Sequence, residues 1–200
     1  IAENYCLPNK NFHDNILEKI LHSSGEIISI KGAPGKGKST YLSYLLNDLE
    51  KLDIPVIRHH YFLSIDDRTH DRLSFNVIAE SLIFQIKNNL KEVDLPSTDS
   101  EKIYELLKIC AQHYKDKGKP FVLIIDGLDH VWRDNQGDKK PLDYFFREIL
   151  PIHDNLVLIV GTQPVDDLLL PDILLTYSPK NNWFNLPSMT GDSIYEYLNN

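Results

Sequence analysis

Cysteine and long apolar runs are scarce in this sequence of 200 residues. The two cysteines, Cys6 and Cys110, lie far apart and form no metal-binding or redox motif, so we expect buried thiols in a reducing compartment. No apolar run reaches the length of a membrane span, and no signal peptide is recognisable. We therefore expect a cytoplasmic protein that makes no contact with a membrane.

Positive charge is also in short supply. Lys and Arg number 21 against 29 Asp and Glu, which gives a formal net charge of −8 at pH 7. Because an acidic surface repels a phosphate backbone, nucleic-acid binding through this domain is disfavoured. The length suits one α/β domain with the beginning of a second. The chain lacks an initiating Met and ends in an apparent helix at Asn200, so we expect it to be part of a longer protein.

Short apolar runs alternate with amphipathic stretches along the whole chain, which predicts a βαβ pattern. The run at 121–125 is the most hydrophobic and suits a parallel strand that is buried on both faces. A doubly wound parallel sheet follows from this alternation, and such sheets bind ligands at the carboxyl ends of their strands. The expected strands are 27–31, 56–63, 121–125, 156–161 and 183–186. The expected helices are 12–21, 38–52, 74–90, 99–117 and 141–150, with a last one after Thr190.

A glycine-rich motif, G-A-P-G-K-G-K-S, follows the first expected strand at Gly32–Ser39 and fits the phosphate-binding P-loop. The glycines allow a tight turn whose N–H groups face an anion, and the following helix offers its positive end. Lys38 would reach the β- and γ-phosphates, and the hydroxyl of Ser39 would bind Mg²⁺. A glycine-rich turn with a surface lysine is the simpler alternative, but the flanking strand and helix favour nucleotide binding. The predicted nucleotide contacts here are Gly32, Ala33, Pro34, Gly35, Lys36, Gly37, Lys38, Ser39 and Thr40.

A second motif, F-V-L-I-I-D-G-L-D-H, has the form of a Walker B element. Asp126, at the tip of the buried strand, would orient Mg²⁺ near the hydroxyl of Ser39. The alternative is an ordinary strand that ends in an Asp-Gly turn. The position of this motif downstream of a P-loop favours the magnesium role.

Two further residues of this motif bear on hydrolysis. Asp129 either polarises the attacking water or is a capping or solvated acid, and the sequence leaves both open. His130 either senses the γ-phosphate or is a partly exposed loop histidine. Since a neutral imidazole is a poor substitute for a second carboxylate near magnesium, we expect slow hydrolysis.

Polar residues also follow the expected strand at 156–161. If this strand lies between the P-loop strand and the Walker B strand, Thr162 or Gln163 would face the γ-phosphate or the attacking water. A Gly-Thr turn that closes the strand is the alternative.

The two motifs together resemble the STAND class of P-loop NTPases, particularly its NACHT-like branch. The D-G-L-D turn is the most specific part, because many other P-loop ATPases have Glu directly after the Walker B Asp. The polar strand 58–62, the segment 161–164 and the final stretch 184–198 support the same resemblance. The family typically has Glu in place of His130, and this departure again predicts slow turnover.

The resemblance implies a three-layer αβα sandwich around a five-stranded parallel sheet of order 5-1-4-3-2. It implies an NTPase domain over residues 1–187 and the start of a small helical domain over residues 188–200. It also implies an adenine contact at Pro187, although the glycine that precedes this proline in the family is absent here.

In function, the resemblance implies a nucleotide-dependent switch. Proteins of this class rest as ADP-bound monomers and oligomerise after nucleotide exchange, when a separate sensor region detects a stimulus. We therefore expect binding of ATP or ADP with Mg²⁺, slow ATP hydrolysis, homo-oligomers on activation, and sensor and effector regions in the same longer chain. Relatives act in innate immunity and cell death, and in bacteria in antiviral defence.

Three other functions remain open. The main alternative is an AAA+-like motor or loader ATPase that acts on protein or nucleic acid, which would be expected to carry Glu beside the Walker B Asp. A small-molecule kinase would need a lid rich in arginine. A domain that binds ATP without hydrolysing it is the third. The arginines do not cluster as a lid requires: they are Arg58, Arg68, Arg72, Arg133 and Arg147.

Overall fold

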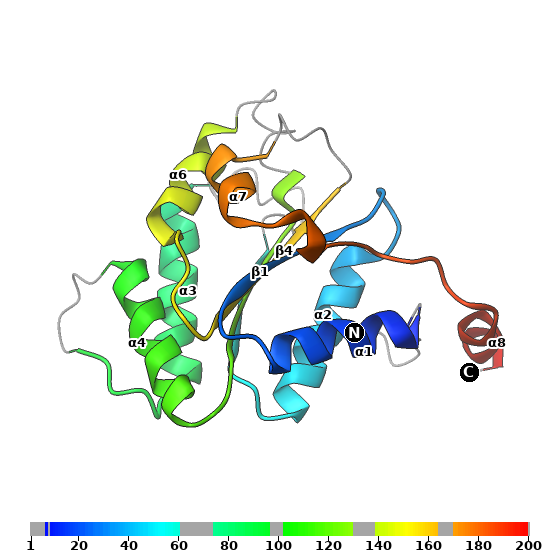
Figure 1. The fold of residues 1–200 in the computed structure, drawn as a ribbon, viewed down its shortest axis with the longest axis horizontal. Helices are drawn as coiled ribbons and strands as arrows, with labels where there is room; N and C mark the ends of the chain where they lie inside the picture. Colours follow the sequence, from blue (N-terminus) through cyan, green and yellow to red (C-terminus); the bar gives the residue numbers. More distant parts are fainter. Residues whose placement is uncertain are drawn as a thin grey trace.

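Five parallel strands form a single sheet at the centre of the protein (Figure 1). The computed structural model describes residues 7, 9–60, 74–96, 102–129, 139–163 and 170–199. The strand order β2-β3-β4-β1-β5 is the predicted order 5-1-4-3-2 and confirms it. The strands are β1 (Glu26–Lys31), β2 (Val56–His60), β3 (Phe121–Asp126), β4 (Leu156–Thr162) and β5 (Trp183–Asn185).

β3 and β4 lie in the interior of the sheet, and every residue of both strands is buried. Their composition explains this position, because Val, Ile and Leu suit strands that are covered on both faces. The register aligns the carboxyl ends of three neighbouring strands: Asp126 pairs with His60 on one side and with Gly161 on the other. Side chains from β2, β3 and β4 therefore meet at one edge of the sheet.

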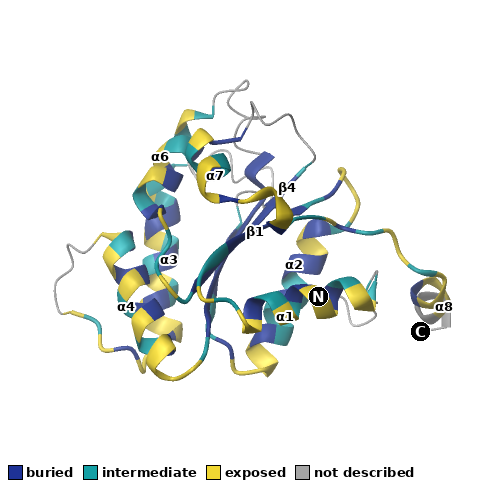
Figure 2. Ribbon diagram, in the orientation of Figure 1, coloured by how far each residue is buried: buried dark blue, intermediate teal, exposed yellow. Residues whose placement is uncertain are grey.

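Helices cover both faces of the sheet, which confirms the predicted three-layer αβα sandwich (Figures 1 and 2). One face packs against α1 (Lys10–Leu21) and α2 (Lys38–Lys51), through apolar residues that include Ile16, Leu42 and Leu45. The other face is covered by helices that share a second, larger apolar cluster. These are α3 (Phe75–Asn89), α4 (Ile103–Asp116), α6 (Lys140–Ile149) and α7 (Asp172–Tyr177).

Most predicted elements are present with boundaries shifted by one or two residues. The strand predicted over 56–63 is present up to His60, and residues 61–63 lie outside the described ones. The helix predicted from residue 99 begins only at Ile103, because Lys102 is extended (φ −69°, ψ 141°), and residues 97–101 lie outside the described ones. Neither α7 nor the 3-10 turn Lys180–Asn182 was predicted from the sequence. Both are too short for a helical period to become visible.

The outer edge of β2 is covered by a side chain of α3. Gln85 accepts a hydrogen bond from the backbone N–H of Arg58 at 2.9 Å and donates one to its carbonyl at 2.8 Å. An amide side chain thus supplies the pairing that a further strand would give, and it holds the backbone of Arg58 in place.

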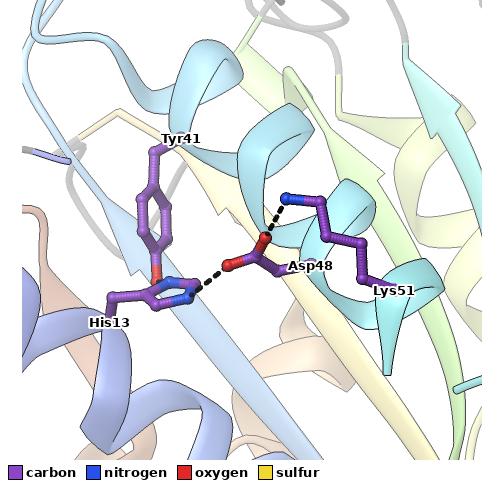
Figure 3. A network of polar contacts seen from close by, with 4 residues as sticks. All are labelled: His13, Tyr41, Asp48 and Lys51. Atoms are coloured by element: carbon purple, nitrogen blue, oxygen red, sulfur yellow. Dashed lines mark hydrogen bonds and ion pairs between the residues drawn. The ribbon is translucent and has the colours of Figure 1, made fainter. Parts of the chain in front are cut away.

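A polar network, buried at His13 and Tyr41 and exposed at Lys51, joins α1 to α2, the helix that follows the P-loop (Figure 3). Nε2 of His13 lies 3.2 Å from Oδ2 of Asp48, and its Nδ1 lies 3.4 Å from the hydroxyl of Tyr41. Lys51 donates to the other oxygen of Asp48 at 2.9 Å. Burial lowers the pKa of His13, and the carboxylate of Asp48 offsets only part of this effect.

The last helix, α8 (Gly191–Asn199), lies apart from the sheet at the end of an extended segment (Figure 1). As predicted, this helix follows Thr190, which caps it: its hydroxyl accepts a hydrogen bond from the backbone N–H of Ser193 at 3.2 Å. The division into residues 1–187 and 188–200 stays a prediction.

Candidate nucleotide-binding site

A pocket of about 420 Å³ lies at the carboxyl ends of the strands, between the glycine-rich loop and the end of β3. Its position agrees with the general rule for open α/β sheets. Among the described residues, the pocket brings together most of the predicted loop, both acidic residues of the second motif, and the end of β4. It is lined by Pro34, Gly35, Lys36, Gly37, Lys38, Ser39, Thr40, Asp126, Gly127, Asp129 and Gln163.

The loop depends on glycine at two positions. Gly35 and Gly37 have φ values of 74° and 82°, in the left-handed region that other residues rarely adopt. Gly37 is the residue directly before α2, and it has no side chain that could cap the helix. The first N–H groups of α2 therefore face the pocket as donors for an anion.

Lys38 is almost fully buried and folds back over the start of the loop. Its Nζ donates a hydrogen bond of 3.0 Å to the carbonyl of Gly32. A Cβ at Gly32 would lie only 2.9 Å from Cγ of Lys38, so glycine is required for this approach. Ala33 closes the turn by accepting a hydrogen bond from the N–H of Lys36 at 3.1 Å. The lysine is thus held beside the loop that would cradle the phosphates.

Asp126 is fully buried and is held from β2 through one of its two oxygens. Nη2 of Arg58 lies 3.1 Å from Oδ2, and Nδ1 of His60 lies 2.9 Å from the same atom. Burial alone would raise the pKa of Asp126, but the neighbouring side chains of His60, Ser39 and Arg58 outweigh it, so the pKa is lowered. Asp126 is therefore an anion in this site.

The other oxygen of Asp126, Oδ1, has no hydrogen-bond partner among the residues that the structure describes. It lies against Gly161 of β4, where a Cβ would collide with it and would approach Cδ1 of Leu42 to 2.7 Å. A buried carboxylate oxygen without a donor is unfavourable, and a cation or a metal-bound water would satisfy it.

These groups fit a magnesium ion that a nucleotide brings with it. Mg²⁺ is usually held by one or two protein oxygens together with phosphates and waters. Asp126 and the hydroxyl of Ser39 would supply the protein oxygens. No group of three or more His, Cys, Asp or Glu suited to a metal occurs in the described part of the chain, so a site made of protein ligands alone is not indicated there.

Asp129 is buried on the pocket wall, with its carboxylate bound by the end of β4. Nε2 of Gln163 donates a hydrogen bond of 2.7 Å to Oδ2 of Asp129. This contact joins the loop after β3 to the end of β4. His130 lies outside the described residues.

Four of the predicted nucleotide contacts do not line the pocket: Gly32, Ala33, Thr162 and Pro187. Thr162 is buried, and its hydroxyl has no partner among the described residues. Of the pair at the end of β4, the structure brings Gln163 rather than Thr162 to the pocket. Pro187 follows Leu186, whose N–H donates to the carbonyl of Lys31 directly before the loop. The nucleotide contacts of Thr162 and Pro187 stay predictions, and Pro164 lies outside the described residues.

Sequence reasoning missed Arg58 and His60 as parts of this site. The polar run at 58–60 was noted, but its contact partner was not. The polar residues at the end of β2 could have predicted this contact. In a parallel sheet the end of a strand lies beside the end of its neighbour, and here His60 pairs with Asp126.

The fold and the site together define the class of this protein. A parallel sheet of this order, a glycine-rich loop between β1 and α2, and an acidic residue at the end of β3 are the features of P-loop NTPases. Residues 9–155 match the family model described as Nephrocystin 3, N-terminal, and the chain belongs to that family. This membership confirms the resemblance to the NACHT-like P-loop NTPases. The comparison with curated proteins gave no match.

Solved structures of low sequence identity share the fold. The ADP form of the ORC2 protein from Aeropyrum pernix has a TM-score of 0.52 at 13% identity, over 99% of this chain and 54% of that one. Domain III of DnaA, the replication initiation protein of Thermotoga maritima, has a TM-score of 0.54 at 15% identity, over 98% of this chain and 70% of that one. The Drosophila ORC bound to GC-rich DNA and Cdc6 has a TM-score of 0.54 at 11% identity, over 94% of this chain and 30% of that one. The chain spans about half the length of the ORC2 protein.

No helix in the described ranges is both long enough and apolar enough to cross a membrane.

Proposed function

We propose that this chain is an ATP- and ADP-binding switch module that hydrolyses ATP slowly and assembles into homo-oligomers in response to nucleotide. In this proposal the module works with sensor and effector regions of a longer chain, and its output is defence signalling in the cytoplasm, as in STAND relatives. The family match and the pocket at Gly32–Ser39 support nucleotide binding. An ADP-bound ORC2 protein of the same fold supports the choice of adenine nucleotide.

Each residue of the pocket has a role in this proposal that follows from its chemistry. The N–H groups of the loop and of α2 bind phosphate oxygens, and Lys38 neutralises the β- and γ-phosphates. Asp126 and Ser39 would hold Mg²⁺ when it is bound with the nucleotide, and this ion would supply positive charge that neutralises the phosphates. Asp129 would accept a proton from the attacking water.

The observation that carries the proposal of slow turnover is the hydrogen bond from Gln163 to Asp129. Gln163 occupies Oδ2, one of the two carboxylate oxygens that could accept a proton from the attacking water, so the contact restricts the action of Asp129 as a base. The same contact connects the pocket wall to β4, so a change at the γ-phosphate can be transmitted to the sheet. Tight binding of nucleotide with little turnover is what a switch requires.

The test measures three properties of the purified chain. We expect copurified or tightly bound ADP, turnover far below one per second, and a larger assembly with a non-hydrolysable ATP analogue than with ADP. Lys38→Ala should abolish nucleotide binding and assembly while the far-UV circular dichroism is retained. Rapid hydrolysis without any stimulus, or equal assembly with both nucleotides, would contradict the switch.

An AAA+-like motor or loader is the second candidate, favoured by the shared fold of DnaA and ORC proteins. One of these structures contains GC-rich DNA, whereas this chain has a formal net charge of −8. Turnover measured with and without double-stranded DNA separates the two candidates. No stimulation supports the switch, and a stimulation of tenfold or more would favour the motor.

A further inference from the structure

Arg58 is the arginine that contacts the proposed magnesium ligand. Asp126 has no exposure to solvent, and the side chain of Arg58 is only 17% exposed where it meets Oδ2. Burying a carboxylate costs free energy unless a cation or donors compensate it. Arg58 supplies such a positive charge at 3.1 Å from Oδ2.

The guanidinium of Arg58 is fixed by more than this ion pair. Its Nη1 donates a hydrogen bond of 2.6 Å to the hydroxyl of Ser43 on α2. Ser43 in turn donates to the carbonyl of Ser39, at the end of the P-loop, at 2.8 Å. Gln85 also binds both the backbone N–H and the carbonyl of Arg58. The ion pair therefore forms with little loss of conformational entropy.

We propose that Arg58 is a resident counter-ion of Asp126, which takes the place of Mg²⁺ when the site holds no metal and against which Mg²⁺ must bind. The inference rests on the proposed function, since it takes Asp126 as a ligand of nucleotide-bound Mg²⁺. Two cations that share one carboxylate repel each other, and screening inside a protein is weak. Arg58 therefore weakens the binding of Mg²⁺, and the phosphates of the nucleotide must offset this repulsion.

The structure also explains why the pair can persist when the metal arrives. Arg58 and His60 both contact Oδ2, so Oδ1 remains for the metal or its water. Arg58 thus acts on the metal through Asp126 and is a positioning residue rather than a metal ligand. If Arg58 served only to orient the carboxylate, its removal would weaken Mg²⁺ binding. If it is a competing counter-ion, its removal strengthens Mg²⁺ binding. The two roles predict changes of opposite sign.

The test is the ratio of the dissociation constants for ADP in EDTA and in saturating Mg²⁺, measured by calorimetry. For Arg58→Met we expect this ratio to rise at least about fivefold over that of the unaltered chain, because the competing charge is gone. Arg58→Lys keeps the charge and should stay within about twofold. Arg147→Met removes an exposed arginine from α6 and is the matched control, with no expected change.

The outcomes are distinguishable. An unchanged or lower ratio in Arg58→Met overturns the counter-ion role, and so does an equal rise in Arg58→Lys, since the charge would then not be the cause. If Arg58→Met does not fold by circular dichroism, Arg58→Gln, which retains a donor for Ser43, is measured in its place with the same expectation.

If the unaltered chain binds no ADP, the proposed function itself fails. If it binds ADP and the ratio does not rise, only this inference fails.

Discussion

The side-chain amide of Gln163 donates a hydrogen bond to Oδ2 of Asp129 at 2.7 Å, across the pocket wall between the end of β4 and the loop after β3. Both residues line the pocket, and Asp129 is buried there. The position of Asp129, the proposed base, therefore depends on a residue at the end of β4. A nucleotide-dependent switch can use such a connection between two parts of the site.

Removal of the Gln163 amide is expected to free Oδ2 of Asp129 from its hydrogen bond to this residue. In Gln163→Leu, which keeps the size of the side chain, the rate of hydrolysis in a single turnover should rise about three- to tenfold, because the oxygen that Gln163 occupies becomes available to the attacking water. The affinity for ADP should stay within about twofold. Quenched-flow measurement of bound ATP checks this prediction. A slower reaction would show that Gln163 orients the base or contacts the phosphate instead.

Asp129→Asn is expected to lower the single-turnover rate by about a hundredfold, since positioned acids and bases contribute roughly 10²–10⁴ to rate. ATP binding, measured by calorimetry, should be nearly unchanged because the ion pair of Asp126 is left intact. Asp143→Asn on α6 is the control and should hydrolyse ATP at the normal rate. An unaltered rate in Asp129→Asn would exclude the base role, whereas the absence of any hydrolysis in the unaltered chain would indicate a domain that binds ATP without hydrolysing it.

Gly161→Ala is expected to destabilise the fold by about 1–3 kcal/mol, the usual cost of overpacking a core. An added Cβ would lie 2.7 Å from Cδ1 of Leu42 and would also collide with Asp126. Urea denaturation measures this loss. Gly191→Ala is the matched control, because no heavy atom lies within 4 Å of a Cβ there, and it should change stability by less than about 0.5 kcal/mol. Equal effects at both positions would contradict the close packing around Asp126.

Acid is expected to weaken the contact between α1 and α2 through His13. Burial lowers the pKa of His13, so the unfolded chain takes up a proton at a pH where the folded chain does not. This contribution to stability is complete above the ordinary histidine pKa and is lost as the pH falls below it. The charged and titratable neighbours are Asp14, Asp48, Lys51, Tyr41 and Tyr44.

The measurement compares melting temperatures at pH 8 and pH 5.5. The fall between the two should be smaller in His13→Gln than in the unaltered chain, because glutamine does not titrate. A fall of the same size in both proteins would show that other groups govern the acid sensitivity.

Several features of the site were predictable from local sequence. The P-loop could be predicted from its glycines, because the loop needs a left-handed backbone at Gly35 and Gly37, which other residues rarely adopt. The apolar run before Asp126 predicts a buried strand because its composition suits burial on both faces. These predictions rest on short-range physics, and the structure agrees with them.

The partners of Asp126 and Asp129 could not be read in the same way. Arg58, His60 and Gln163 are distant from them in sequence, and only the register of β2, β3 and β4 brings them together. The choice of Gln163 over Thr162 at the pocket depends on the direction in which each side chain leaves the end of β4. Side chains of successive strand residues point to opposite faces, so one residue of register decides which of the two meets the site.

The sequence by itself determined the phosphate loop, the acidic strand end and the alternation that leads to a parallel sheet, because each depends on residues that are neighbours along the chain. The tertiary structure decided which cation neutralises Asp126 and which amide restrains Asp129. Those pairings depend on strand order and register, which arise from the packing of the whole core.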